Sequence, residues 1–233
     1  MNILAFDTAT PVTSVAVSVQ GALVAEISMT SDKIQMERLM PMVDAALSEG
    51  GVDIHAISGI AVGVGPGLFT ALRIGVTAAN TLSQVLRVPL AGISSLDTLA
   101  AGVAYRGGTI AAAIDARRGE IFTSVYQATG GIAIPEGPPR VLDPVVLADE
   151  LAARDETVTM VGDGFAAYCT AFKEKLTNRV TPASPEFMYP RASSLLMLAE
   201  PVLAGADSGT PGLVVPMYVR QPDAVEMIKK MKQ

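Results

Sequence analysis

The sequence predicts an α/β protein made of two related halves, each running β-β-β-α-β-α-β-α. Three observations carry this prediction. Apolar residues alternate with a period of two in some segments and recur at three and four in others. The segment ILAFD at 3–7 resembles IAAAID at 110–115, and each is followed by Thr-Ser-Val, at 13–15 and 123–125. Half of the 233 residues are hydrophobic and 17% are charged, which suits a sizeable buried core.

The distance between the two matching strands favours duplication of a whole half. Asp7 and Asp115, which end the two strands, lie 108 positions apart. This spacing is too long for a solenoid repeat, whose period is about 20–50 residues. The alternative, that two buried strands both happen to end in aspartate, stays open on the sequence alone.

The first half begins with strands and then alternates helices with strands. Val15, Val17 and Val19 alternate with small or polar residues, and Gln20-Gly21 supplies a turn. Residues 33–48 change to a helical period, in which Pro41 should kink the helix or begin a new first turn. The expected strands are 2–6, 15–19, 23–27, 58–64 and 89–93, and the expected helices are 33–48, 70–86 and 95–104.

The second half repeats this order from residue 109. The turn Gly130-Gly131 should lead into its third strand. The other expected strands are 109–114, 121–126 and 158–161, and the expected helices are 144–153, 165–176, 193–203 and 224–232.

Charge and cysteine content limit the class of protein. The formal net charge is -6, so tight binding of nucleic acid by this chain alone is disfavoured. The single cysteine, Cys169, excludes an internal disulfide and suits a reducing cytosol. The first ten residues lack a basic segment and reach an acid at Asp7, which argues against a signal peptide, and no apolar stretch reaches about 18 residues. A cytoplasmic protein without a membrane span is therefore expected.

Asp7 and Thr8 are candidate ligands for a phosphate. An acid at the end of a buried strand, followed by a tight hairpin, can place a carboxylate and backbone N–H groups beside a phosphate or its metal. The alternative is that Asp7 only caps the hairpin turn. Gly63-Val64-Gly65-Pro66-Gly67 and Gly162-Asp163-Gly164 each join a strand to a helix, and each is either an anion loop or an ordinary turn. Neither matches a Walker A loop.

The first two long helices carry faces that could pair with another helix. A methionine face adapts to irregular partners, and a stripe of small residues allows close approach. One interpretation is that both faces pack inside this chain. The other is that they form a surface for a second polypeptide. The residues of the predicted surface are Met36, Met40, Val43, Ala71, Gly75, Ala78 and Ala79.

Residue types needed for several enzyme classes are scarce. The one histidine, His55, falls in an expected turn, and neither His-Glu-x-x-His nor Cys-x-x-Cys occurs. Cys169 lies among apolar residues without an obvious base. A metallohydrolase or a Ser-His-Asp enzyme is therefore disfavoured, whereas an independent ATPase or small-molecule kinase using Asp7 or Asp115 stays open.

Six segments in order resemble one known family. They are ILAFDTAT at 3–10, ERLMP at 37–41, GVGPGLFTALRIG at 63–75, DARRGEIF at 115–122, GDG at 162–164 and PMYVR at 216–220. Together they resemble the TsaB (YeaZ) family, the bacterial partner subunits of the threonylcarbamoyltransferase TsaD. The resemblance spans nearly the whole chain.

The resemblance implies an actin-like ATPase (ASKHA) fold with a reduced second half. It implies an N-terminal domain at 1–104, a smaller domain at 105–215 and a C-terminal segment at 216–233 packing back on the first domain. It also implies a non-catalytic subunit, because the catalytic relative holds a metal with a His-x-x-x-His pair and the matching stretch here, 33–37, has no histidine.

The family further implies partners and a pathway. The pathway is N6-threonylcarbamoylation of adenosine 37 in tRNAs that read codons starting with A. The chain would pair with TsaD, or with itself when alone, through its first two long helices, and would join the TsaE ATPase in a ternary complex. Contact with tRNA would be indirect. No cofactor is expected on the isolated chain, with ATP or ADP confined to the assembled complex, and Asp7 and Thr8 would be a vestigial phosphate loop.

Overall fold

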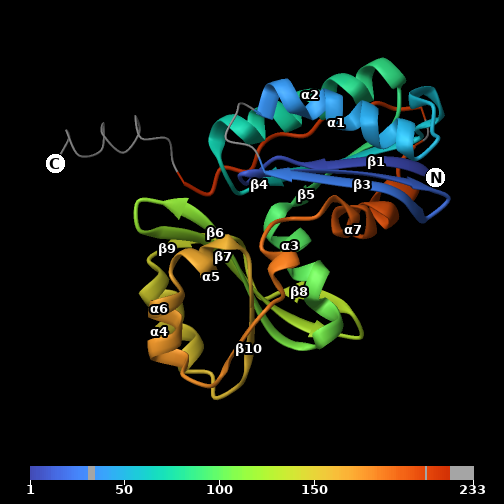
Figure 1. Ribbon diagram of the computed structural model, residues 1–233. Helices are drawn as coiled ribbons and strands as arrows, with labels where there is room; N and C mark the ends of the chain where they lie inside the picture. Colours follow the sequence, from blue (N-terminus) through green and yellow to red (C-terminus); the bar gives the residue numbers. More distant parts are fainter. Residues whose placement is uncertain (31–34, 208, 221–233) are drawn as a thin grey trace.

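The computed structural model describes residues 1–30, 35–207 and 209–220, and Figure 1 shows them arranged as two halves with one sheet each. The predicted helix at 224–232 lies outside the described residues, as do the first two residues of the helix predicted at 33–48.

The first sheet has the strand order β3-β2-β1-β4-β5. Its strands β1, β2 and β3 are antiparallel neighbours, whereas β4 and β5 run parallel to β1. The elements of this half are β1 (Asn2–Asp7), β2 (Val12–Val19), β3 (Ala22–Thr30), α1 (Gln35–Glu49), a 3-10 turn (Ile54–Ala56), β4 (Gly59–Gly65), α2 (Phe69–Leu86), β5 (Leu90–Ser94), α3 (Ser95–Val103) and a second 3-10 turn (Ala104–Arg106).

The second sheet repeats that topology, with the order β11-β10-β6-β7-β8 and β9 also paired to β7. Here β6 pairs antiparallel with β7 and parallel with β10, as β1 does with β2 and β4. The duplicated halves are thereby confirmed. The elements are β6 (Gly108–Arg117), β7 (Glu120–Thr129), β8 (Ile132–Pro135), β9 (Arg140–Leu142), α4 (Pro144–Ala152), β10 (Val158–Val161), α5 (Asp163–Ala167), α6 (Cys169–Leu176), β11 (Val180–Pro182), a 3-10 turn (Pro185–Phe187) and α7 (Ala192–Ala204).

Two details of the second half differ from the sequence prediction. The helix expected at 165–176 is divided into α5 and α6, because Tyr168 has φ -120° and ψ 29°, outside the helical region. The short strands β9 and β11 have only three residues each, too few for an alternating pattern to identify them.

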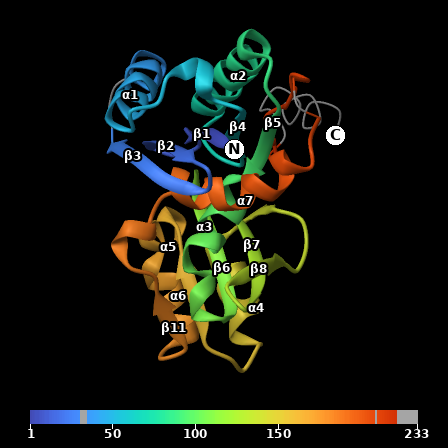
Figure 2. The same ribbon diagram turned by 90° about the vertical axis from the view of Figure 1, so that its right-hand side faces the viewer.

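The helix that ends each half packs on the sheet of the other half. Leu96, Leu99 and Val103 of α3 lie in the core of the second sheet, whereas Leu195 and Leu203 of α7 lie in the core of the first. Figure 2 shows α3 and α7 between the two sheets. Domain boundaries drawn at residues 104 and 215 therefore separate both helices from the sheets that bury them.

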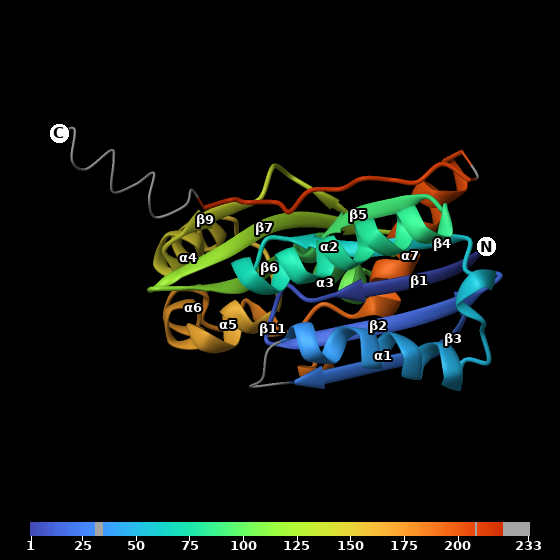
Figure 3. The same cartoon turned by 90° about the horizontal axis from the view of Figure 1, so that it is seen from above.

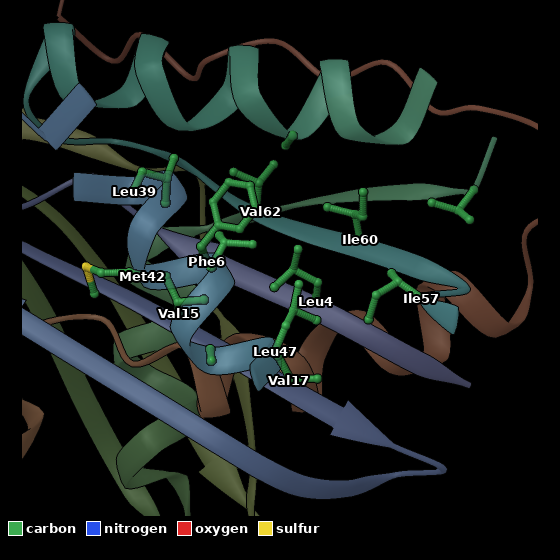
Figure 4. Close-up of a cluster of buried hydrophobic side chains, with 14 of the residues drawn as sticks. Leu4, Phe6, Val15, Val17, Leu39, Met42, Leu47, Ile57, Ile60 and Val62 are labelled. Atoms are coloured by element: carbon green, nitrogen blue, oxygen red, sulfur yellow. The ribbon is translucent and has the colours of Figure 1, made fainter. Parts of the chain in front are cut away.

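The opposite face of the first sheet is covered by α1 and α2. Figure 3 shows these helices side by side above the strands. Beneath them lies a core to which Leu4, Phe6 and Val62 contribute from the strands and Leu39 and Leu47 from α1, as Figure 4 shows. This core fixes which face of each helix is left for solvent.

Glu26 on β3 anchors the start of α7. Its carboxylate accepts hydrogen bonds from the Arg191 guanidinium, from Ser193 N at 3.0 Å and from Ser193 Oγ at 2.8 Å. Burial raises the pKa of Glu26, but these hydrogen bonds and the Arg191 charge outweigh burial and hold the pKa below its usual value. The carboxylate thus satisfies a backbone N–H in the first turn of α7.

We expect Glu26→Ala to lower the free energy of unfolding by about 1–2 kcal/mol, because hydrogen bonds to a charged group are lost. Urea unfolding at neutral pH measures this change. Glu37→Ala, at an exposed position in the first turn of α1, is the control. An equal effect of both substitutions would contradict the anchoring role.

Candidate functional site

The carboxylate of Asp7 is sealed inside the first half. Its Oδ1 accepts a hydrogen bond from Ala9 N at 2.7 Å, and its Oδ2 accepts one from Ser95 Oγ at 2.6 Å. The residue is 1% exposed. Gly63 lies directly against it, since a Cβ there would be 1.9 Å from Asp7 Oδ2. Burial raises the pKa of Asp7 to about 6, although both hydrogen bonds act in the opposite direction.

Thr8 is covered by α2. Its Oγ1 donates to the carbonyl of Ala71 at 2.7 Å, and it is fully buried. Gly75 permits this contact, because a Cβ on Gly75 would be 2.4 Å from Thr8 Oγ1. The resemblance implies that Asp7 and Thr8 are a vestigial phosphate loop, and neither side chain is open to a phosphate in this structure. Both side chains are buried, and their polar atoms bond within the chain.

The glycine segment before α2 forms a packing turn. A Cβ on Gly67 would be 2.1 Å from the carbonyl oxygen of Ala9. Leu68 N donates to that same oxygen at 2.7 Å. The glycine therefore serves the close approach of two backbone segments.

The surface predicted for a partner is displaced on both helices. Val43 is 1% exposed, Ala71 2% and Ala79 0%, and Gly75 is also buried. These four residues face the first sheet and the Thr8 loop, where α2 approaches closely, so their assignment to a partner surface is wrong. Met36 lies in α1, but its side chain is outside the described residues.

The solvent side of the two helices carries a groove of about 500 Å³. Met40 on α1 is 43% exposed and Phe69 on α2 is 52% exposed. The two predicted residues Met40 and Ala78 are therefore both brought to this surface. The lining residues are Leu39, Met40, Phe69, Thr70, Arg73, Ile74, Thr77 and Ala78.

The sequence contained a signal for the groove residues on α2. Thr70, Ile74 and Ala78 are spaced four apart, one position before Ala71, Gly75 and Ala79. One residue corresponds to about 100° around a helix, so the two stripes point in clearly different directions. Of the four residues predicted on α2 for the partner surface, three belong to the buried stripe and Ala78 belongs to the stripe that lines the groove.

The acid that corresponds to Asp7 in the second half is more open. Asp115 accepts from Tyr168 OH at 3.2 Å and pairs with the Arg117 guanidinium at 3.0 Å. Asp163 Oδ1 accepts from Asp115 N at 3.0 Å. Burial raises the pKa of Asp163, and the nearby Asp115 charge acts in the same direction. A Cβ on Gly162 would be 2.1 Å from the Ala113 carbonyl, so this glycine also serves close packing.

A second cavity, of about 470 Å³, lies between the halves. Its walls come from the segment before α2, the β6–β7 turn and residues 217–220. Arg117, Arg118 and Arg220 line it together with Phe69 and Tyr218. Phe69 lines both this cavity and the groove, so the two hollows adjoin.

Within the described parts of the chain, no group of three or more His, Cys, Asp and Glu side chains is placed to hold a metal ion. His55 is exposed on the 3-10 turn between α1 and β4. In residues 1–30, 35–207 and 209–220, no helix is both long and apolar enough to span a membrane.

Comparison with protein families finds a matching model over most of the chain. Residues 29–228 match the model described as TsaD, tRNA N6-adenosine threonylcarbamoyltransferase. A Bacillus subtilis (strain 168) protein named tRNA threonylcarbamoyladenosine biosynthesis protein TsaB is 32% identical over 227 residues, which cover 96% of each chain. The protein of the same name from Escherichia coli (strain K12) is also 32% identical, over 94% of this chain and 95% of its own.

Comparison with solved structures gives the same result. YeaZ from Pseudomonas aeruginosa superimposes with a TM-score of 0.77 and 31% identity, over 93% of this chain and 99% of its own. The match covers both halves, and the actin-like ATPase fold expected from the sequence is confirmed.

Proposed function

The chain belongs to the TsaB (YeaZ) family of tRNA threonylcarbamoyladenosine biosynthesis proteins, and from this premise we propose that it is a non-catalytic subunit that binds and supports the TsaD transferase in the cytoplasm. Its part in making threonylcarbamoyladenosine follows from the family. The supporting role and the pairing with TsaD are the proposal.

The groove between α1 and α2 is the observation that carries the proposal. Two large apolar side chains, Met40 and Phe69, are about half exposed at a hollow of about 500 Å³. Exposed apolar side chains around a concave helical surface are typical of an interface with another protein. Ala78 and Thr77 are short, so a helix of the partner could approach α2 closely.

The residues available for catalysis support the non-catalytic part of the proposal. Asp7, the acid best placed for phosphate chemistry, is buried and bonded to Ser95 of α3 and to Ala9. The only histidine of the chain, His55, is exposed and distant in sequence from Asp7 and Asp115. An independent ATPase or kinase would need one of these acids beside its nucleotide, and only Asp115 is partly open.

The same groove accounts for the other expected partners. Without TsaD, two copies of this chain would cover it by pairing their α1 and α2 helices. TsaE and any ATP or ADP would then belong to the assembled complex and not to the isolated chain.

Reconstitution tests the proposed role. We expect TsaD alone to give little threonylcarbamoylated tRNA and this chain alone to give none, whereas the mixture is active. Asp7→Asn in this chain should leave the mixture active, because the proposed role needs no catalytic carboxylate from it. Activity of this chain without TsaD, or loss of activity with Asp7→Asn while the two proteins still co-elute, would contradict the proposal.

A further inference from the structure

The cavity between the halves has chemistry that pairing through the groove does not use. Four charged residues line it: Arg117, Arg118, Arg220 and Asp115. The chain as a whole has a formal charge of -6, yet three of these four side chains are cationic. Asp115 and the neighbouring Glu120 offset two of these charges, and the positive charge that remains on an acidic protein favours an anionic ligand at that place.

The arginines are held in position by the fold. Arg220 donates to the Ala116 carbonyl at 2.8 Å and pairs with Glu120, and its guanidinium lies 5.6 Å from the centre of the Phe122 ring. Arg117 pairs with Asp115 at 3.0 Å while its side chain stays 61% exposed. A guanidinium fixed in this way keeps N–H groups for a phosphate oxygen.

The backbone of the β6–β7 turn is strained at the two adjacent arginines. Arg117 has φ 62° and Arg118 has φ 59°, and Gly119 follows with φ 81°. Glycine or asparagine adopts such left-handed angles at lower cost, and Asn-Gly is the preferred pair in a two-residue turn of this type. Strain of this kind is typical of functional sites, where the side chain matters more than the backbone.

Aromatic rings stand at the mouth of the cavity. Phe69 and Tyr218 stack with their ring centres 5.2 Å apart, and they are 52% and 48% exposed. Arg73 lies 5.2 Å from the centre of the Phe69 ring. Exposed aromatic faces beside arginines are the combination with which proteins hold single-stranded nucleic acid, by stacking on bases and contacting phosphates.

We propose that this cavity binds an unpaired stretch of the substrate tRNA, with Arg117, Arg118 and Arg220 contacting phosphates and Tyr218, which packs on Phe69, stacking a base. The proposal rests on the proposed function, which supplies tRNA as the substrate of the complex. Since Phe69 also lines the groove between α1 and α2, the bound RNA lies beside the partner subunit. The acidic chain then contributes one local contact to tRNA.

The turn offers a test that separates charge from stability. Arg118→Asn removes one guanidinium and creates the favoured Asn-Gly turn, so the variant should be at least as stable as the wild type. Arg87→Asn is the matched control. Arg87 is exposed, also has a positive φ of 53° and caps the far end of α2, about 27 Å from the start of that helix. Each variant loses one positive charge at a left-handed residue.

The measurement is the affinity for unmodified tRNA by fluorescence anisotropy, with the TsaD–chain complex and with the isolated chain in parallel. We expect Arg118→Asn to weaken tRNA binding by the complex about fivefold to tenfold and to reduce the slope of log K against log salt by about 0.7. Tyr218→Ala should weaken it about tenfold. Arg87→Asn should leave both unchanged.

Equal effects of the two asparagine variants, or no effect of Arg118→Asn and Tyr218→Ala, would overturn the proposal. Co-elution with TsaD is scored on the same samples. If a variant no longer co-elutes with TsaD, that result counts against the proposed function. The difference in tRNA affinity between Arg118→Asn and Arg87→Asn is then still measured on the isolated chain.

Discussion

Asp7→Asn is expected to raise the free energy of unfolding at pH 7 by about 1–2 kcal/mol. In the native protein Asp7 is 1% exposed and hydrogen bonds only to neutral groups, Ser95 Oγ and Ala9 N. Burial therefore raises its pKa from 3.8 to about 6. Asparagine can keep both contacts, with its Oδ1 accepting from Ala9 N and its amide donating to Ser95 Oγ, and no charge has to be buried.

The direction in which stability changes with pH follows from the raised pKa of Asp7. A folded-state pKa above the unfolded value means that the folded state holds its proton more tightly. The contribution of Asp7 to stability is complete below pH 3.8 and is lost as the pH rises through 6. Asparagine does not titrate, so the difference between variant and wild type should grow across this window and level off above it.

Urea unfolding of both proteins between pH 4 and pH 7 measures this difference. Subtracting the free energy of unfolding of one protein from that of the other removes the contributions of the other titrating groups, because both proteins contain them. Two results would contradict this account: a variant less stable than the wild type at pH 7, or a stability difference that does not change with pH. Either would show that the buried charge of Asp7 does not destabilise the folded protein.

Met40→Arg is expected to weaken pairing with TsaD by about a hundredfold or more. Met40 lines the groove between α1 and α2, and Arg73 lines the same groove. A partner that covered this surface would bury an arginine without a carboxylate and beside a like charge, which costs about 3–5 kcal/mol. Because Met40 is 43% exposed in the free chain, the substitution should leave folding intact.

Met197→Arg is the matched control for this substitution. Met197 lies on α7, on the other side of the first sheet from α1 and α2, and is 65% exposed. Calorimetric titration of each variant into TsaD should give near wild-type affinity for Met197→Arg and little or no heat for Met40→Arg. Equal affinities of the two variants for TsaD would show that the interface lies outside the α1–α2 groove. Weaker binding by Met197→Arg than by Met40→Arg would place the interface on the face that carries α7.

The sequence was sufficient for the architecture because the evidence for it is local. A period of two or of three to four residues shows within a few turns of chain which segments are strands and which are helices. The matching acids Asp7 and Asp115 add the duplication, and the strand orders confirm it. Packing of α7 on the first sheet could not be deduced, because it joins residues as far apart in the chain as Ile3 and Leu195. For α3 the pattern shows an apolar face but not which of the two sheets that face covers.

The site was harder to predict for the same reason. A stripe such as Ala71, Gly75 and Ala79 shows which residues share a face of a helix but not whether that face turns inward. Thr8, 63 residues earlier, decides it by bonding to Ala71. The stacking of Phe69 on Tyr218 joins positions 149 residues apart, so no local pattern reveals it.

The central claim is that a partner covers the α1–α2 groove, and methionine oxidation of the wild-type protein tests it most directly. Peroxide converts exposed methionines to the sulfoxide, and Met40 and Met197 are 43% and 65% exposed. The rate at each is read by mass spectrometry with and without TsaD. We predict that TsaD slows oxidation of Met40 about tenfold and leaves Met197 unchanged. Protection of Met197 while Met40 oxidises at its free rate would contradict the claim.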